Sequence, residues 1–309
     1  MRIYTEISKE LKNLNNQVIT IGSFDGVHIG HQKILSSLLN RAKEISGEAI
    51  VLTFNVPPRK VLFAEKSNGI LTSKDEKIKA LNSLGIETVI ILDFSREIAN
   101  ISAIDFINEI KKNLGIVEIV AGYDHAFGKD RKGDIDFLKK YTTSNRLGLT
   151  IVEPMIIDSR PVSSTWIRSM LEQGNIDRAN KLLGRRYTIT GEVVKGVGRG
   201  GSLLGFPTAN IKPDSIHKII PSNGVYAVTV EINERHIKQG MLNIGTNPTF
   251  DGESRTVEVN IFDFDDNIYG KKMELRFHKK MREERKFDSP DDLIKQLEID
   301  KLTAINILN

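Results

Sequence analysis

The sequence lacks cysteine and is poor in aromatic residues. With 0 cysteines among its 309 residues, the chain has no disulfide bonds, thiolate metal ligands or cysteine nucleophiles. Aromatic residues make up only 6% of the chain, which argues against a surface that stacks the bases of nucleic acid. No apolar run approaches the roughly 20 residues of a membrane span, and the N-terminal M-R-I-Y-T-E-I-S-K-E has no apolar signal core. We therefore expect a cytoplasmic protein without membrane or nucleic-acid partners.

The composition is that of a globular protein. Hydrophobic residues account for 39% and charged residues for 27% of the chain, enough for sizeable buried cores. A length of 309 residues favours two domains. The net charge of +4, with no long basic block, mildly favours anionic ligands such as nucleotides.

Residues 18–31, V-I-T-I-G-S-F-D-G-V-H-I-G-H, combine a strand, a glycine-punctuated loop and the start of a helix. The apolar run at 18–21 predicts a buried strand, Gly22 ends it, and an amphipathic pattern begins near Ile29. Such a loop directs backbone N–H groups and the positive end of a helix dipole at one point. The stretch therefore predicts a phosphate-binding site.

His28 and His31 are three residues apart and share a face at the start of this helix. Two imidazoles at that place can donate hydrogen bonds to the negative charge that develops on a phosphorus during group transfer. An isolated His-x-x-His is more often a solvated surface pair. The preceding strand, the glycines and Asp25 favour the functional interpretation here.

The first half of the chain alternates strand and helix patterns. Helices are predicted at 29–45, 74–84 and 102–114, and further strands at 49–54, 88–92, 117–122 and 149–153. This alternation predicts a Rossmann-like, doubly wound parallel sheet, whose ligands bind beyond the carboxyl ends of the strands. The segments that follow these ends should form one crevice: Gly22 to His31, Asn55 to Pro58, Asp93, and Gly122 to His125.

The pattern changes at Gly184, after two short helices predicted within 171–187. Strands with period-two alternation follow at 187–194, 225–232, 237–244, 255–262 and 273–277, and a helix at 288–301. This pattern predicts an antiparallel β-barrel with a C-terminal helix. The predicted domains are therefore 1–183 and 184–309.

Several motifs together resemble one protein family. H-I-G-H resembles the signature of the nucleotidyltransferase superfamily, and G-S-F-D-G-V-H-I-G-H-Q resembles the bacterial bifunctional riboflavin kinase/FMN adenylyltransferase family, also called FAD synthetase. The resemblance continues, in the family's order, through G-Y-D-H-A-F-G-K-D-R-K-G-D (122–134), V-S-S-T-W-I-R (162–168), G-F-P-T-A-N (205–210), V-E-V-N-I-F-D-F (257–264) and M-R-E-E-R-K-F (281–287). It covers nearly the whole chain.

The resemblance implies that the first domain transfers an adenylyl group from ATP to FMN, giving FAD, with His28 and His31 as catalytic residues. The residues implied to bind ATP and its phosphates are Gly22, Ser23, Phe24, Asp25, Gly26, His28, His31, Ser164, Thr165 and Arg168. The residues implied to bind the flavin are Asn55, Tyr123, Asp124, Phe127 and Arg131. Two simpler interpretations remain open: K-D-R-K-G-D as a solvated turn, and the hydroxyls at 163–165 as a helix cap.

The resemblance implies that the second domain phosphorylates riboflavin with ATP to give FMN. Glu258 would be the catalytic base, although an outward-facing acid on an alternating strand is the simpler interpretation. Thr208 and Asn210 would hold Mg²⁺ and the phosphates of ATP, and Arg282 and Phe287 the flavin. The kinase residues implied to bind ATP are Gly196, Gly198, Gly200, Gly205, Pro207, Thr208 and Asn210. The expected partners are riboflavin, FMN, FAD and ATP.

The chain departs from the family pattern in its first half. Ser23 stands where asparagine is usual, Asn55-Val56-Pro57 replaces a segment that usually carries an acid and a His-Pro pair, and His125 stands where an aromatic residue is usual. These departures keep a second interpretation open, a riboflavin kinase whose N-terminal half is a weakened or regulatory module. A third is an adenylating domain joined to an RNA-binding barrel, which the scarcity of aromatic residues argues against.

Overall fold

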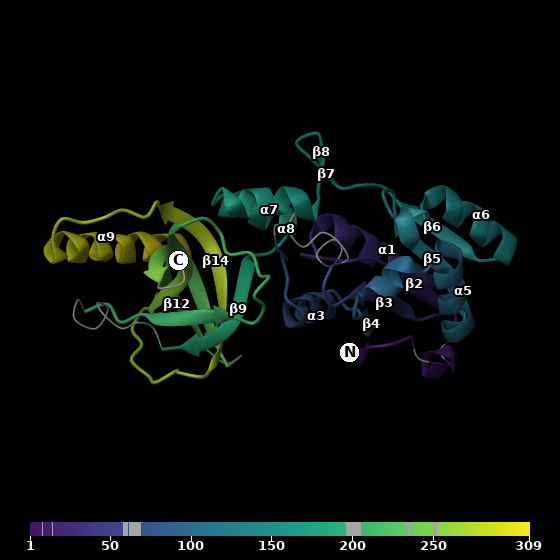
Figure 1. Ribbon diagram of the computed structural model, residues 1–309, viewed down its shortest axis with the longest axis horizontal. Coiled ribbons are helices and arrows are strands. Elements are labelled where there is room, and N and C mark those ends of the chain that lie inside the picture. The colour runs from purple at the N-terminus through teal and green to yellow at the C-terminus, as the bar shows by residue number, and fades with distance from the viewer. Residues whose placement is uncertain are drawn as a thin grey trace. The chain divides into compact units, whose positions relative to one another are not determined.

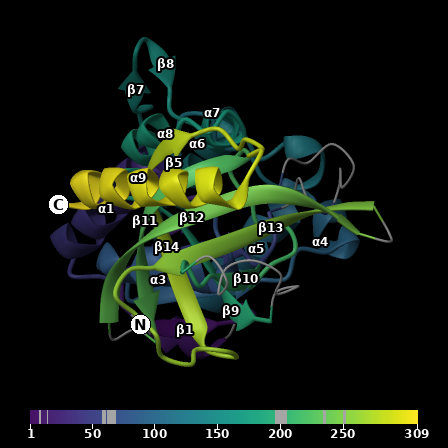
Figure 2. The ribbon, with the colours of Figure 1, turned by 90° about the vertical axis from the view of Figure 1, so that its left-hand side faces the viewer.

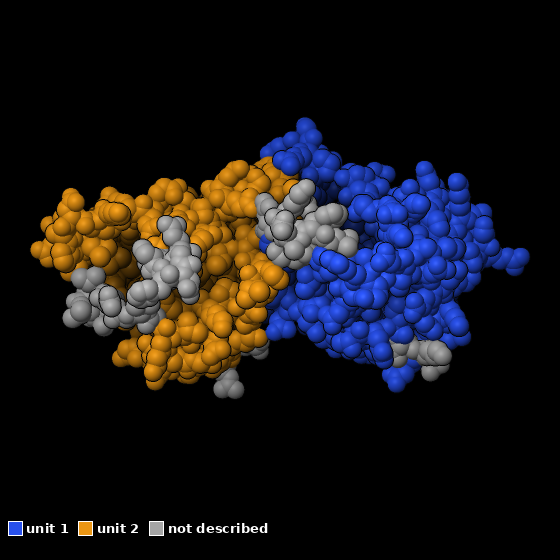
Figure 3. All heavy atoms as spheres, viewed as in Figure 1, with its two compact units in different colours: residues 1–164 blue, residues 165–309 orange. Residues whose placement is uncertain are grey.

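The computed structural model describes residues 1–7, 9–13, 15–57, 61, 69–195, 205–233, 236–249 and 252–309 (Figure 1). The chain divides into two compact units, residues 1–164 and 165–309 (Figure 3). The domain boundary predicted between residues 183 and 184 lies further along the chain, after a helix pair, and stays a prediction.

The first unit is built on a six-stranded parallel sheet. Its strands lie in the order β1-β4-β3-β2-β5-β6, and every neighbouring pair is parallel. The strands are β1 (Arg2–Tyr4), β2 (Gln17–Ile21), β3 (Ala49–Phe54), β4 (Thr88–Leu92), β5 (Ile116–Gly122) and β6 (Gly148–Val152). The chain runs from β2 to one side and later returns to the other, so the sheet is doubly wound, as predicted. Its topological switch point is the carboxyl end of β2.

Alternate strand residues face two cores, one on each side of this sheet. Val18, Val51 and Val89 pack against α1 and α3, whereas Ile19, Leu52 and Ile90 pack on the side of α5 and α6 (Figure 1). The helices of this unit are α1 (Ile29–Glu44), α3 (Lys74–Ser83), α4 (Arg96–Asn100), α5 (Ala103–Leu114) and α6 (Ile135–Asn145), with 3-10 turns η1 (Lys9–Asn13) and η3 (Lys129–Arg131). Burial on both faces explains the continuous apolar runs of the strands.

The second unit contains a closed antiparallel barrel. The barrel order is β10-β13-β12-β11-β14-β9, closed by pairing between β9 and β10. Its strands are β9 (Tyr187–Val194), β10 (Ala209–Pro213), β11 (Gly224–Ile232), β12 (His236–Thr249), β13 (Gly252–Ile261) and β14 (Lys272–Arg282). The predicted barrel and its C-terminal helix are confirmed.

The helix α9 (Pro290–Leu308) lies across the barrel wall (Figure 2). Ser289 caps its first turn and Pro290 occupies its first position, two residues that favour a helix start. Ala304 is fully buried against Ala227 of β11 and Met241 of β12. Within the described ranges, no helix is both long and apolar enough to cross a membrane.

Several elements differ from the sequence predictions. Two short helices were predicted within 171–187, but only α8 (Ile176–Leu183) lies wholly within this stretch. The helix α7 (Ser164–Glu172) begins earlier, at the hydroxyl cluster, where the sequence had left a helix start open. The strands β1 and β10, the helix α6 and the hairpin β7–β8 (Ile156–Ile157 and Arg160–Pro161) were not predicted. β1 and the hairpin strands are too short for a periodic pattern, and β10 opens within the P-T-A-N motif, whose composition is typical of loops.

Candidate active sites

The loop between β2 and α1 lies at the switch point of the parallel sheet. The Gly22 amide donates to the carbonyl of Leu52, which keeps the loop against the end of β3 (3.0 Å). Phe24 and Val27 are buried with φ angles of 45° and 42°, a left-handed conformation that is uncommon outside glycine. Packing of these two side chains in the core holds the loop in this shape, which is typical of functional loops.

His28 caps the first turn of α1. Its Nδ1 accepts a hydrogen bond from the His31 amide at 3.3 Å, so the ring proton of the neutral imidazole lies on Nε2. The His28 and His31 rings stack with their centroids 3.6 Å apart. A Cβ at Gly30 would lie 3.1 Å from the His28 ring, which explains the glycine between the histidines. His28 therefore offers a hydrogen-bond donor, Nε2–H, at the start of the helix.

Asp25 is buried and bound to backbone rather than open to solvent. Its carboxylate accepts from the amides of Leu71 (2.9 Å) and Thr72 (3.1 Å). The hydroxyl of Thr72 in turn accepts from the Gly26 amide at 3.0 Å. The Ser164 hydroxyl donates to the backbone carbonyl of Asp25 at 2.9 Å. In this arrangement Asp25 and Ser164 hold the shape of the loop.

The predicted flavin residues of the first unit follow β3 and β5. Asn55 donates from its amide to Asp93 after β4 at 2.9 Å, and Tyr123 is 43% exposed after β5. Asp124 and Arg131 are also exposed. Phe127 differs, because it is buried and its ring contacts Phe106 and Phe137 in the core. The structure thus gives Phe127 a packing role, and the loop residues around it remain available to a ligand.

His125 has an unusual environment in the same loop. Its Nε2 is buried and has no hydrogen-bond partner within the part of the chain that the structure describes. Burial, followed by the positive charge of Arg131, lowers the pKa of His125 to about 4. The imidazole is therefore neutral at physiological pH.

Thr165 and Arg168 lie on α7 and belong to the second unit. Their predicted contact with the phosphates of ATP stays a prediction. Gly196, Gly198 and Gly200, predicted to bind ATP in the kinase, lie outside the described residues, as does Pro58 of the predicted crevice.

The barrel unit holds a cavity of about 340 Å³ between the strands, the segment after β14, and α9. Its lining comprises Phe206, Thr208, Val225, Met241, Leu242, Asn243, Glu258, Asn260, Arg282, Glu284, Arg285, Phe287, Leu293 and Leu297. Four predicted kinase residues from three separate segments thus meet at one cavity: Thr208, Glu258, Arg282 and Phe287. Gly205 and Pro207 are exposed just before β10.

Strand register places polar side chains beside Glu258. The residue pairs with Asn210 on β10 and with Asn243 on β12. Directly paired residues of an antiparallel sheet point to the same face, so these three side chains form one row. The flanking Val257 and Val259 are buried on the opposite face. Glu258 and Asn243 of this row line the cavity, and Asn210 lies next to Glu258 on the same face of the sheet.

An ion pair lies beside the cavity at Arg282, one of the residues predicted to bind the flavin. Arg282 binds Asp300 of α9 through two nitrogens, at 3.0 Å from Nε and 2.6 Å from Nη2. The Asp300 side chain is 4% exposed, so the pair is largely shielded from water. The guanidinium groups of Arg282 and Arg285 lie 5.8 Å and 4.7 Å from the ring centroid of Phe287. The pair therefore joins the end of β14 to α9. The segment that carries Phe287 lies between the two paired residues in the sequence.

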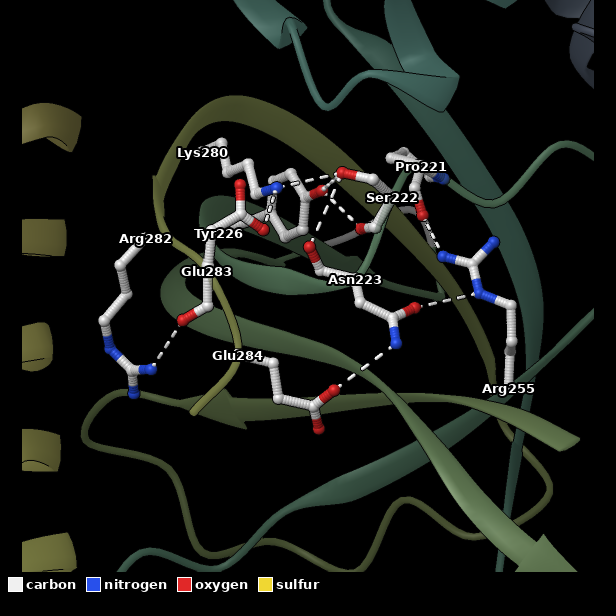
Figure 4. A network of polar contacts seen from close by, with 9 residues as sticks. All are labelled: Pro221, Ser222, Asn223, Tyr226, Arg255, Lys280, Arg282, Glu283 and Glu284. Carbon is white, nitrogen blue, oxygen red and sulfur yellow. Dashed lines mark hydrogen bonds and ion pairs between the residues drawn. The ribbon is translucent and has the colours of Figure 1, made fainter. Parts of the chain in front are cut away.

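A polar network supports the cavity from the segment before β11 (Figure 4). Arg255 donates to the carbonyls of Ile220 and Pro221 and to the Asn223 side chain. The Asn223 amide donates to Thr246 (2.9 Å) and to Glu284 (3.3 Å), which lines the cavity. Arg255 thus orients Asn223, and Asn223 orients Glu284.

Sequence reasoning missed several cavity residues, among them Asn243, Asn260, Glu284 and Arg285. Asn260, Glu284 and Arg285 lie in segments whose family resemblance was recognised, but these individual side chains were not assigned a role. Asn260 donates to the Pro207 carbonyl at 2.7 Å and supports the P-T-A-N segment. Within the described ranges, no group of three or more His, Cys, Asp or Glu residues could hold a metal ion.

Two family models match consecutive parts of the chain. A model described as FAD synthetase matches residues 10–166, and a model described as riboflavin kinase matches residues 183–308. These ranges contain the β2–α1 loop and the barrel cavity, respectively.

Relatives match along nearly the full chain. A Bacillus subtilis protein named bifunctional riboflavin kinase/FMN adenylyltransferase is 36% identical over 292 residues, covering 93% of this chain and 91% of the relative. A Haemophilus influenzae protein of the same name is 37% identical over 300 residues, covering 96% of each. A solved structure from Streptococcus pneumoniae, titled as a macrolide-efflux protein, has a TM-score of 0.88 at 33% identity and covers 99% of both chains.

Proposed function

Because the chain belongs to the bifunctional riboflavin kinase/FMN adenylyltransferase family, we propose that its own residues catalyse both reactions, one in each unit. It contains both a riboflavin kinase domain and an FAD synthetase domain. The barrel unit phosphorylates riboflavin with ATP, and the α/β unit transfers an adenylyl group from ATP to FMN, releasing pyrophosphate. The observation that carries the proposal is the matching of both family models, in succession, to the two units.

In the kinase reaction, Glu258 accepts the proton of the ribityl hydroxyl. The hydroxyl oxygen then forms its bond to the γ-phosphorus of ATP while the bond to ADP breaks. The position of Glu258 in the cavity lining, paired with Asn210 and Asn243, supports this role. Arg282 and Phe287 form the flavin side of the same cavity.

The kinase residues also fit a magnesium ion. Thr208 offers a hydroxyl oxygen and Asn210 an amide oxygen, and Mg²⁺ prefers oxygen ligands that leave room for water and phosphates. When bound, the ion would neutralise negative charge on the ATP phosphates. The proximity of Asn210 to Glu258 in the register supports placing the phosphates beside the base.

In the adenylyl transfer, a phosphate oxygen of FMN attacks the α-phosphorus of ATP and pyrophosphate leaves. His28 donates through Nε2–H to the charge that develops on this phosphorus, and His31 acts with it from the stacked position. The helix N-terminus adds a favourable dipole. Both reactions depend on positioning and charge neutralisation, without a covalent enzyme intermediate.

Chromatography of the products from riboflavin, ATP and Mg²⁺ tests the proposal. Formation of FMN and then FAD is the expected result. Formation of FMN alone would select the kinase with a weakened N-terminal half. That alternative has less support, because the FAD synthetase model matches residues 10–166 and the curated relatives are named for both activities.

We also propose that the kinase is self-contained from Gly184 onward. The αL conformation of Gly184 ends α8, and β9 begins three residues later at Tyr187. A fragment of residues 184–309 should fold and convert riboflavin to FMN at a rate near that of the full chain. A folded but inert fragment would contradict this boundary.

A further inference from the structure

Lys77 is a buried cation next to the β2–α1 loop, and its contacts indicate a role in positioning that loop. Its side chain is 1% exposed, although it lies on α3, whose outward residues are solvated. Its Nζ contacts the carbonyl of Ser23 (2.9 Å), the carbonyl of Phe54 (2.6 Å) and the hydroxyl of Thr53 (3.4 Å). These acceptors lie in the loop after β2 and at the carboxyl end of β3.

The contact set matches an ammonium group. A charged lysine has three N–H donors, and three acceptors surround Nζ. Burial lowers the pKa of Lys77 to about 8, and the negative charge of Asp25 opposes this shift. At neutral pH the group is therefore mostly charged.

The contact with Ser23 fixes the direction of one peptide group. In a trans peptide, the carbonyl of one residue and the N–H of the next point in opposite directions. Lys77 and the Thr53 hydroxyl, which donates at 3.0 Å, both hold the Ser23 carbonyl on the inner side of the loop. The Phe24 N–H therefore points away from Lys77, toward the outer side of the loop.

We propose that Lys77 is a positioning residue for adenylyl transfer, which orients the Ser23–Phe24 peptide so that the Phe24 N–H meets a phosphate of ATP. The inference rests on the proposed adenylyltransferase function. A preorganised backbone N–H needs no rearrangement when the charge on the phosphate develops. The buried positive charge, one peptide group away, stabilises the same anion.

The test compares Lys77→Met with Lys79→Met in the full chain. Lys79 lies on the same helix and is exposed. For Lys77→Met, kcat/KM for ATP in FAD formation from FMN should fall about 10²-fold, the cost of a small misplacement of reacting groups. The rate of riboflavin phosphorylation and the KM for FMN should not change. Lys79→Met should match the wild type in these two quantities and in kcat/KM for ATP. A folded Lys77→Met variant that forms FAD within threefold of the wild-type rate would overturn the proposal.

Chemical rescue separates positioning from a general loss of structure. Truncation in Lys77→Ala removes three carbons and the nitrogen, the size of propylamine. Propylammonium should restore FAD formation at least tenfold, whereas tetramethylammonium, which has no N–H donor, should not. Equal effects of the two ions, or no rescue by either, would reject the role.

The wild-type enzyme offers a measurement that does not depend on a variant's folding. The kcat/KM for ATP reports ionisations of the free enzyme. Asp25 is the charged group that acts on Lys77, and its negative charge opposes the lowering of the Lys77 pKa by burial. The kcat/KM for ATP in FAD formation should fall tenfold per pH unit above a pKa near 8. The kcat/KM for ATP in riboflavin phosphorylation should not show this decrease. Absence of the decrease in FAD formation would overturn the proposal, whereas absence of all FAD formation would overturn the proposed function itself.

Discussion

The two units place their reactive groups by different means. In the barrel, register aligns Asn210, Glu258 and Asn243 across three strands, so each position follows from hydrogen-bonded pairing. In the α/β unit, the groups lie on a loop and a helix start, and their positions depend on contacts from other segments, such as Asp25 with Leu71. The row of side chains in the barrel is therefore set by strand pairing, whereas the loop groups of the α/β unit are set by contacts with supporting residues.

The difference bears on how each site should respond to substitution. A change at the barrel row removes one chemical group and leaves the strand pairing intact. A change at a supporting residue of the α/β loop moves several backbone groups together. Substitutions of reacting groups and substitutions of supporting groups should therefore have different effects on the activities of the two units.

The largest effect is expected from replacing both histidines of the α/β unit. Each transition-state hydrogen bond contributes about 10²–10³ in rate, so His28→Ala/His31→Ala should reduce FAD formation by roughly 10⁴-fold or more. Riboflavin phosphorylation should remain near normal, because it takes place in the other unit. Both rates are measured by chromatography of the flavins. Unchanged FAD formation would show that the two histidines are an ordinary surface pair without a catalytic role.

Glu258→Gln should give the next largest effect. The amide keeps the shape of the side chain but cannot accept the hydroxyl proton, so FMN formation should fall roughly 10²–10⁴-fold. FAD formation from supplied FMN is the internal control and should persist. A loss of tenfold or less would show that Glu258 lines the cavity without acting as the base. Equal losses in both reactions would indicate misfolding.

Asp300→Ala tests how the barrel cavity is supported beside Arg282, which is proposed to bind the flavin. Loss of the buried carboxylate leaves Arg282 without its ion-pair partner, which typically costs about 3–5 kcal/mol. We expect a lower melting temperature of the barrel unit and a KM for riboflavin raised about tenfold or more, with the KM for FMN in adenylyl transfer unchanged. Glu298→Gln, an exposed change on the same helix, is the matched control. An unchanged KM for riboflavin would show that the pair does not shape the cavity.

The smallest effect concerns the pH dependence at His125. Its pKa is about 4 in the folded chain and about 6.5 when unfolded, so the unfolded state binds the proton more tightly. The stability that His125 contributes is complete above pH 6.5 and is lost as the pH falls toward 4. Denaturation of wild type and His125→Phe across this range should show a shallower acid loss in the variant. Titration of the His125 ring signal by NMR with a midpoint near 6.5 would contradict this.

The strand and helix assignments that succeeded have strong periodic patterns. The strand predicted at 88–92 and that at 187–194 match β4 and β9, and the helix predicted at 102–114 matches α5, with Ser102 and Gly115 as its caps. Failures concern elements without such a signal. α6 carries four consecutive polar residues at its C-terminal end, Thr142 to Asn145, and was not recognised as a helix. Its packing against β6 forms only in the folded unit.

The sites show the same division between local and long-range information. Glu258 and Arg282 belong to recognisable motifs, so they could be named before their meeting at one cavity was known. Lys77, in K-I-K-A, reads as a solvated lysine, because its burial depends on the ends of two strands that lie before it in the sequence. The assignment of Phe127 to the flavin stays a prediction, and the packing of its ring in the core could not be read from the motif.

The ion pair between Arg282 and Asp300 has a consequence for the entropy of binding. It joins two residues that are 18 positions apart and so closes the intervening segment, which carries Arg285 and Phe287, into a loop. A loop with tethered ends has fewer conformations than an open segment. Less conformational freedom then remains to be lost when a ligand orders that segment, and the affinity is correspondingly higher. If a ligand occupies this cavity as proposed, α9 therefore contributes to its binding through a segment that lies outside the helix itself.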